Sequence, residues 1–372
     1  MPKAKKKLLP KDFDALLRTG DLGTLKAVFD ACELDARGGY GKQSALAFRD
    51  CPDELARWLV AQGADLEARD TYGRTPLHAH AGNWQGRIDT LLDLGADIQA
   101  TDKDADTPLH KAAKSANPEA VKALLARGAK VGALNTAGLT PLAAGLQYCS
   151  NAQIETMAEV SELLLAADPP RKSGLGDLVK RAFAGGRPAP GPVTPQMRAF
   201  VQRIGENFEF HRAGFNPDSV EATSAGLDRL YVLFDAPPVP RRVMHDGRAP
   251  IVAKAARWQD QQQELWAMLV PSRGPAATVQ GEVIRIAGRV ADEVDRNGAA
   301  NWDADYGKMT RAFLAHLGSG APLPDSERER AARVVAEVRE RDGAGGELCE
   351  LAVSWVKLNP TPMPLGPPGY ER

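Results

Sequence analysis

The stretch Thr107-Pro108-Leu109-His110-Lys111-Ala112 decides how the chain folds, because copies of it recur at a nearly fixed interval. One copy begins at Thr75, 32 residues earlier, and another at Thr140, 33 residues later. A weaker copy begins at Ser44. A second motif repeats in phase with the first: Leu59…Gly63-Ala64-Asp65-Leu66, Leu92…Gly95-Ala96-Asp97-Ile98 and Leu125…Gly128-Ala129-Lys130-Val131. Two motifs in phase at about 33 residues indicate an array of similar structural units.

Each unit contains the start and stop residues of a helix pair. Thr107 can cap a helix whose first residue is Pro108, where the missing N–H of proline costs nothing. Asn117-Pro118-Glu119 provides the same start for a second helix, with an acid in its first turn. Gly128, like Gly63 and Gly95, suits the left-handed residue that ends a helix. The sequence therefore predicts a helix, a short turn and a second helix in each unit.

The turn segments between units, called fingers below, are 70–74, 102–106 and 135–139. Gly73 and Gly138 suit a tight turn, whereas Ala105 stands at the corresponding position of the middle finger. We therefore expect the 102–106 turn to be strained or differently shaped.

These motifs and their spacing resemble the ankyrin-repeat family over residues 11–168. The resemblance implies an all-α fold: a solenoid of helix pairs with β-hairpin-like fingers, followed by a separate helical domain. Its units lie near residues 44–70, 75–102, 107–135 and 140–168. An atypical helix pair over 12–32 precedes them as a terminal unit. The last unit carries an insertion around 148–156.

The rest of the chain divides by composition. We expect a solvated basic tail over 1–10, a Pro/Gly linker over 169–195, a helical domain over 196–360 and a proline-rich tail over 361–372. A short amphipathic segment, 175–183, is expected to pack on the last repeat. Helices are expected near 194–212, 216–234, 258–269, 278–296, 303–317, 326–341 and 347–357, and the first two read as an antiparallel hairpin.

Composition excludes several classes of function. The 47 basic and 48 acidic residues nearly cancel, which argues against a nucleic-acid partner. No apolar run reaches the ~20 residues of a membrane span, and no secretory signal follows the charged N-terminus. The four cysteines have no disulfide or zinc spacing, so a cytoplasmic location is the default. We expect Cys32, Cys51 and Cys149 to be buried in apolar helical surroundings.

The histidines are interpreted as structural. In ankyrin-like units the histidine of the first motif, here His78 or His110, hydrogen-bonds backbone near the finger. His80 replaces the expected alanine, and its pairing with His78 does not suggest a metal site, because alternate residues on a helix point to different faces. No metal ion and no cofactor are expected.

The second half contains charged residues but no recognisable catalytic motif. Glu282 and Arg285 are one helical turn apart, as on a solvated helix face. Asp303 is expected to cap the helix that follows it, and Trp258, Trp266 and Trp302 are expected in a core. The run from Glu264 to Asp303 resembles uncharacterised bacterial domains, and the Ala-, Gly-, Arg- and Pro-rich composition suits a bacterial source. We therefore predict that the protein is not an enzyme.

The partner-binding residues are expected on the concave surface formed by the fingers and first helices. Tyr72, Arg74 and Trp84 are the predicted anchors, because these residue types dominate interface energetics. Trp84 is placed in a loop on the back of its unit. The complete set of candidate partner-binding residues is Tyr72, Arg74, His80, Trp84, Lys103, Asp104, Asp106, Lys111 and Lys114.

The sequence thus favours a protein that binds another protein through its repeats. A narrower alternative is an immunity or antitoxin protein that neutralises a bacterial toxin. A second alternative is an enzyme with a pocket lined by Glu282, Arg285, Asn301 and Asp303. A third is a scaffold with no single partner.

Overall fold

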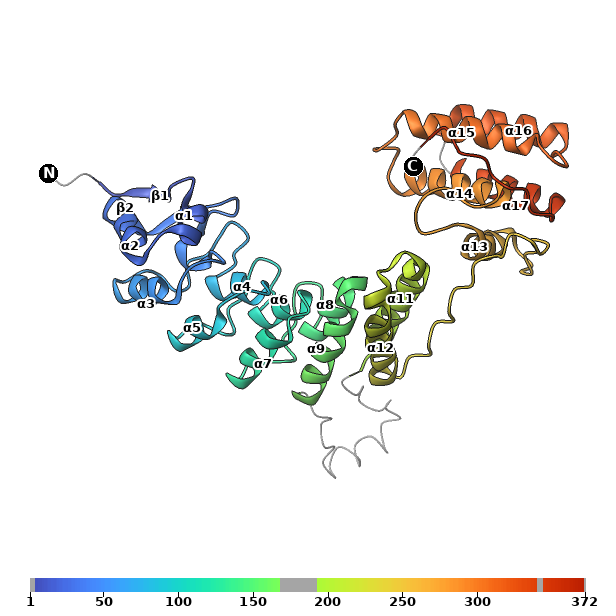
Figure 1. Cartoon of the computed structure of the whole chain (residues 1–372). Helices are drawn as coiled ribbons and strands as arrows, with labels where there is room; N and C mark the ends of the chain where they lie inside the picture. The colour runs from blue at the N-terminus through green and yellow to red at the C-terminus, as the bar shows by residue number, and fades with distance from the viewer. Residues whose placement is uncertain (1–3, 168–192, 340–343, 371–372) are drawn as a thin grey trace, which may run out of the picture. The chain divides into compact units, whose positions relative to one another are not determined.

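The computed structural model describes residues 4–167, 193–339 and 344–370. The chain forms two compact units. The first comprises Met1–Phe208 and Asn216–Val239, and the second comprises Glu209–Phe215 and Pro240–Arg372. The described residues are mostly helical (Figure 1). None of the helices in these ranges has the length and apolar run required to cross a membrane.

Helix pairs repeat through the first unit as the motifs predict. The first helices are α4 (Pro76–Ala81), α6 (Pro108–Lys114) and α8 (Pro141–Tyr148). The second helices are α3 (Asp53–Ala61), α5 (Ile88–Asp93), α7 (Pro118–Ala126) and α9 (Ile154–Ala167), which line up along one side of the stack in Figure 1. The degenerate copy at Ser44 forms only the short 3-10 helix η1 (Ala45–Ala47). The insertion before α9 holds another, η2 (Asn151–Gln153).

The predicted helix boundaries rest on the expected caps. The Asn117 side chain accepts from Ala120 N at 3.1 Å, and Thr140 Oγ accepts from Ala143 N at 3.3 Å. Gly63, Gly95 and Gly128 all have positive φ, between 83° and 98°. These local interactions confirm the helix starts and stops inferred from sequence.

The fingers are joined by backbone hydrogen bonds into a ladder. Thr71 N donates to Gly41 O at 2.9 Å, Lys103 N to Tyr72 O at 3.1 Å and Thr136 N to Asp104 O at 2.8 Å. The first of these bonds shows that residues 39–43 form a finger of their own. The fingers are therefore numbered below from the first to the fourth as 39–43, 70–74, 102–106 and 135–139. The fourth residue of each finger has positive φ: Lys42, Gly73, Ala105 and Gly138. The prediction of strain at Ala105 is confirmed, because its φ is +57°.

The N-terminal unit contains the predicted helix pair, α1 (Phe13–Thr19) and α2 (Leu22–Ala31), but it also contains a small sheet. Strand β1 (Lys6–Leu8) pairs in parallel with β2 (Cys32–Gly38), which pairs antiparallel with β3 (Gln43–Ser44). The expectation of a solvated tail over 1–10 is therefore wrong for residues 6–8. Their side chains are exposed, and it is backbone pairing that orders them.

The cysteines differ partly from their predicted surroundings. Cys32 and Cys51 are buried, as predicted. Neither lies in a helix, because Cys32 is in strand β2 and Cys51 is in the loop before α3. Cys149 is half-buried at the end of α8. Burial raises the pKa of the Cys51 and Cys149 thiols to about 12, so both remain protonated at neutral pH.

Helices α11 (Pro195–His211) and α12 (Pro217–Phe234) form where expected, but the first unit extends into them. Arg203 donates to Gln147 O at 2.5 Å, and Arg229 pairs with Glu162 at 2.8 Å. A Cβ on Gly226 would lie 2.7 Å from Glu155 Cα, so α12 packs closely on α9. The compact unit that contains the repeats therefore continues past residue 196, where the sequence predicted a domain boundary. Most of the predicted linker, and the segment 175–183, lie outside the described residues.

The second unit has an all-helical core. It is built from α13 (Trp258–Leu269), α14 (Val279–Ala291), the π-helical turn η4 (Asp292–Arg296), α15 (Ala304–Leu317), α16 (Asp325–Glu337) and α17 (Ala344–Leu358). Trp258, Trp266 and Trp302 pack against this core, as predicted. The proline-rich tail lies on α14: Met363 N donates to the Gln280 side chain at 3.0 Å, and Val279 N donates to Met363 O at 2.8 Å.

Candidate protein-binding surface

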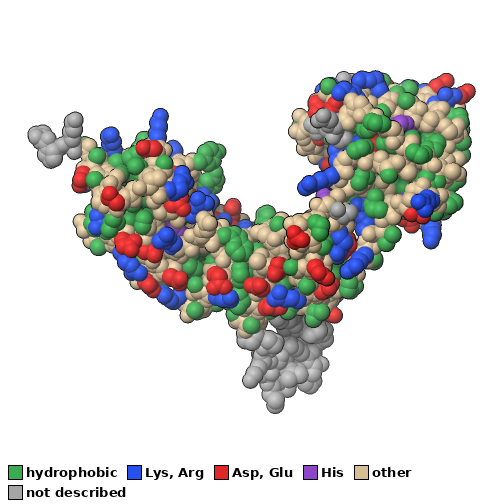
Figure 2. Space-filling view, viewed as in Figure 1, with side chains coloured by type: hydrophobic (Ala, Val, Ile, Leu, Met, Phe, Trp, Pro, Cys, Tyr) green, Lys and Arg blue, Asp and Glu red, His purple; other side chains and the backbone are tan. Residues whose placement is uncertain are grey.

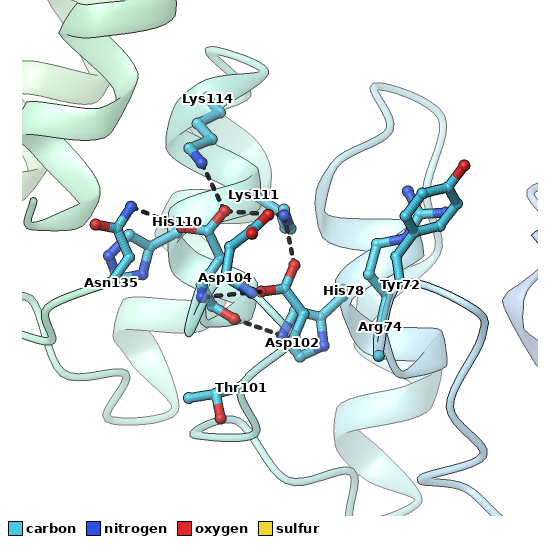
Figure 3. Close-up of polar contacts among 12 residues, drawn as sticks. Tyr72, Arg74, His78, Thr101, Asp102, Asp104, His110, Lys111, Lys114 and Asn135 are labelled. Atoms are coloured by element: carbon cyan, nitrogen blue, oxygen red, sulfur yellow. Dashed lines mark hydrogen bonds and ion pairs between the residues drawn. The ribbon is translucent and has the colours of Figure 1, made fainter. Parts of the chain in front are cut away.

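The third finger carries a closed network of charges (Figure 3). Asp102 Oδ1 accepts from the backbone N–H of Asp104 at 2.9 Å and of Asp106 at 3.0 Å, which folds the turn. Lys111 and Lys114 reach back from α6, and their ammonium groups lie 2.9 and 2.6 Å from Asp106 Oδ2. Lys111 also pairs with Asp102 at 2.6 Å. The finger and the first helix that follows it are thereby fixed to each other.

The buried part of this network balances its own charge. The side-chain oxygens of Asp102, Asp104 and Asp106 lie within 4.8 Å of one another, a spacing that could suit a cation. The two lysines already neutralise the two buried carboxylates. Burial opposes ionisation of Asp106, but hydrogen bonds from Lys114, Lys111 and Asn135 outweigh it and lower its pKa to about 2.

The burial of Asp106 corrects its assignment as an exposed finger residue. Its side chain is fully buried, and those of Lys111 and Lys114 are about one-fifth exposed. An aspartate that accepts from two lysines and from Asn135 Nδ2 has no face left for a partner. The role of these three residues is therefore to fix the shape of the surface, since the charges of Asp106, Lys111 and Lys114 are paired with one another.

The second finger presents an aromatic ring backed by an arginine. Tyr72 is 46% exposed, and the Arg74 guanidinium lies 4.7 Å from its ring centroid. Arg74 also donates to Asp70 Oδ2 at 2.8 Å through Nε. The two predicted anchors are therefore in contact, and the cation–π interaction with Arg74 restrains the Tyr72 ring.

Two further tyrosines extend this aromatic surface, and the sequence interpretation missed both. Tyr40 on the first finger is 94% exposed. Tyr148, at the end of α8, is 60% exposed, with Lys114 Nζ 4.9 Å from its ring. Extending the finger pattern back from Ser44 would have found Tyr40. The position of Tyr148 in the last turn of the helix that begins at Pro141 would have pointed to it. Lys103 and Asp104 are exposed on the third finger, as predicted.

The two motif histidines hold the fingers, as predicted. His78 Nε2 lies 2.9 Å from Asp106 O, and His110 Nε2 lies 3.0 Å from Leu139 O. The backbone amides of Thr75 and Thr107 donate to the Nδ1 atoms of the same rings. Since an amide can only donate, both rings are neutral with the proton on Nε2.

His80 was expected to face a partner, but it is buried, with 2% exposure. Its Nε2 lies 2.9 Å from Leu46 O in the preceding unit, and its Nδ1 accepts from Arg87 N at 2.9 Å. The imidazole therefore fixes the loop over 82–87. That loop carries Trp84, which is 53% exposed and whose Nε1 donates to Ser115 O at 2.9 Å.

The four residues named for an enzymatic pocket have separate structural partners in the second unit. Glu282 and Arg285, expected on a solvated face, form a buried ion pair at 2.6 Å. Tyr370 from the tail donates to Glu282 Oε1 at 2.6 Å and closes the pair. Asp303 caps α15, as predicted, and Asn301 N donates to Glu293. The pocket that would favour an enzyme is therefore not formed by these four residues.

Comparison with known families agrees with the repeat geometry. The family model for ankyrin repeats (3 copies) matches residues 44–135 and, in an overlapping match, residues 84–169. A search of curated proteins found no match to this chain. Residues 44–169 therefore contain ankyrin repeats, which in general are scaffolds that bind other proteins. Both matches end before α11 begins.

Proposed function

We propose that the protein binds another protein through its inner face, defined as the fingers together with α4, α6 and α8. The observation that carries this proposal is the set of exposed tyrosines, Tyr40, Tyr72 and Tyr148, on this face. Tyrosine is among the residue types that dominate binding energy in protein interfaces. Its ring buries a large area while only two side-chain torsions become ordered.

The rigidity of the fingers supports the proposal. The ladder of backbone hydrogen bonds and the histidine bonds hold each finger to its neighbour. Little conformational entropy is then lost when a partner binds, and this raises affinity without any new contact. A ring on a fixed finger is a better anchor than the same ring on a mobile loop.

Charged side chains are paired both on the inner face and on the second helices, and it is the exposed tyrosines that set the inner face apart. Asp70, Asp102 and Asp106 are paired with basic side chains at 2.6 to 2.9 Å, so much of the inner-face charge is compensated. In the view of Figure 2, acidic and basic side chains alternate over the second helices. There Asp93 pairs with Arg127 at 2.7 Å across units. This pattern is typical of a solvated surface.

We favour binding over catalysis because the second unit keeps Glu282 and Arg285 in a closed pair. Each oxygen of Glu282 accepts from protein donors, so the carboxylate has no position from which to act on a substrate.

The proposal is tested by affinity purification from source cells with three versions of the full chain. The wild-type chain should retain a partner that the Tyr72→Ala, Tyr148→Ala double variant loses by at least tenfold. The matched control, Arg57→Ala on the second helix α3, removes an exposed side chain without touching the inner face and should retain it. Equal recovery with all three versions would overturn the proposal.

A further inference from the structure

Helix α5 is shorter than its equivalents in the neighbouring units. It spans 6 residues, whereas α3 and α7 each span 9. Before α5 the chain follows the loop 82–87. A groove of about 370 Å³ lies beside this loop, bordered by the start of α5 and by α7. Its lining includes Trp84, Ile88, Asp89, Glu119, Lys122 and Ala123.

The loop that carries Trp84 has a fixed shape. Arg87 N donates to the buried His80 ring, and Gly86 N donates to Asn83 O at 2.9 Å. A Cβ on Gly86 would lie 1.9 Å from His80 O, so this position requires glycine. The Trp84 indole N–H is already bonded to Ser115 O. The exposed indole is thus held in place with its polar atom satisfied, which leaves its aromatic surface for a ligand.

The groove has one more acidic group than basic groups. Glu119 pairs with Lys122 at 2.7 Å, and that hydrogen bond raises the pKa of Lys122. Asp89 also lines the groove, and its carboxylate has no ion pair with any side chain in the described ranges. An exposed indole beside an uncompensated carboxylate is a suitable site for an organic cation.

We propose that this groove binds an arginine or lysine side chain of a protein partner, at a site separate from the inner face. The indole would contact the cation through its ring, and Asp89 would pair with the charge. The volume lies near the lower end of the roughly 300 to 1,000 Å³ typical of ligand pockets, which suits a single long side chain. The site does not depend on partner binding by the tyrosines.

The experiment is an NMR titration of the full chain with its tryptophans labelled with ¹⁵N. The chain has six indole N–H signals, and a Trp84→Phe variant assigns the relevant one. The probe is the peptide acetyl-Gly-Arg-Gly-amide. Its control replaces arginine with citrulline, which has nearly the same shape but no charge. Titrations are repeated with Asp89→Asn and with Tyr72→Ala.

The proposal expects the Trp84 signal to move saturably with the arginine peptide. The citrulline peptide should bind at least tenfold more weakly, and Asp89→Asn should weaken arginine binding at least threefold. Tyr72→Ala should leave the titration unchanged. The other five signals report whether Asp89→Asn is folded. If Asp89→Asn is unfolded, the charge interaction is tested with the wild-type chain. Its affinity for the arginine peptide must then fall as the NaCl concentration rises from about 0.05 M to about 0.5 M. An unmoved Trp84 signal, or equal binding of the two peptides, would overturn the proposal.

Discussion

His80 and Leu46 are joined across two repeat units by a 2.9 Å hydrogen bond from the imidazole Nε2 to the backbone carbonyl oxygen. The same ring accepts from Arg87 N, so one buried side chain links the preceding unit to the Trp84 loop. Two residues that depart from the repeat pattern, His80 and Trp84, are therefore connected structurally. The histidine orders the loop that presents the tryptophan.

The substitution His80→Ala should destabilise the first unit by about 1–3 kcal/mol, because it leaves the buried Leu46 carbonyl and the partly buried Arg87 amide without their partner. Urea denaturation monitored by circular dichroism would measure this loss. Ala79, half-exposed on the same helix, provides the matched control, and Ala79→Ser should change stability by less than about 0.5 kcal/mol. If His80→Ala and Ala79→Ser had the same stability, the linking role of His80 would be rejected.

Acid should weaken the first unit through three buried histidines. Burial lowers the pKa of His78, His80 and His110 below the usual value near 6.5. Because the folded state favours the neutral rings, this contribution is complete above pH ~6.5 and declines below it, by up to about 1.4 kcal/mol per pH unit for each histidine. Urea midpoints at pH 7.5 and 5.5 would measure the decline. Imidazole ¹⁵N shifts showing charged rings at pH 6.5 would contradict the assignment.

The strain at Ala105 predicts a stabilising substitution. Ala105→Gly should raise the unfolding free energy by about 0.5–1 kcal/mol, because glycine adopts a φ of +57° without steric cost. The reverse change at the equivalent position, Gly138→Ala, should lower it by a similar amount. A Cβ on Gly138 meets no atom within 4 Å, so that variant isolates the backbone effect. Thermal unfolding of both variants tests the pair, and changes of the same sign would refute the explanation.

Loss of the Asp106 carboxylate should leave Lys111 and Lys114 without their common partner. We expect Asp106→Asn to cost about 3 kcal/mol, toward the low end for a broken buried pair because both lysines retain some contact with water. Asp104→Asn, on the exposed neighbour, should cost less than about 0.5 kcal/mol. Since the folded pKa of Asp106 is about 2, its stabilisation is present above pH ~4 and is lost as the pH falls toward 2. Equal stability of the two variants would argue against the network.

Features that depend on neighbours along the chain were predictable from the sequence. The helix starts at Pro76, Pro108 and Pro141, the glycine stops and the strain at Ala105 follow from local backbone chemistry. Strand β1 was not predictable, because its Lys-Lys-Leu sequence is ordered by backbone pairing with residues more than 20 positions away.

The candidate site was predictable only in part, because burial of a polar group depends on its partners. Asp106 resembles an exposed finger residue until Lys111 and Lys114 reach back from the next helix. The i,i+3 spacing of Glu282 and Arg285 fits a solvated face equally well, and Tyr370, which helps to bury the pair, is 88 residues away from Glu282. By contrast, Tyr72 and Trp84 lie in turns, where large aromatic side chains find few neighbours to cover them.

The central claim, that the inner face is a protein-binding surface, is tested most directly by site-specific photocrosslinking in source cells. A photoreactive phenylalanine analogue would replace Tyr72 on the inner face or, as the control, Arg57 on the second helix α3. The account predicts a discrete protein adduct from position 72 and none from position 57. No adduct from position 72, or the same adduct from both positions, would contradict it.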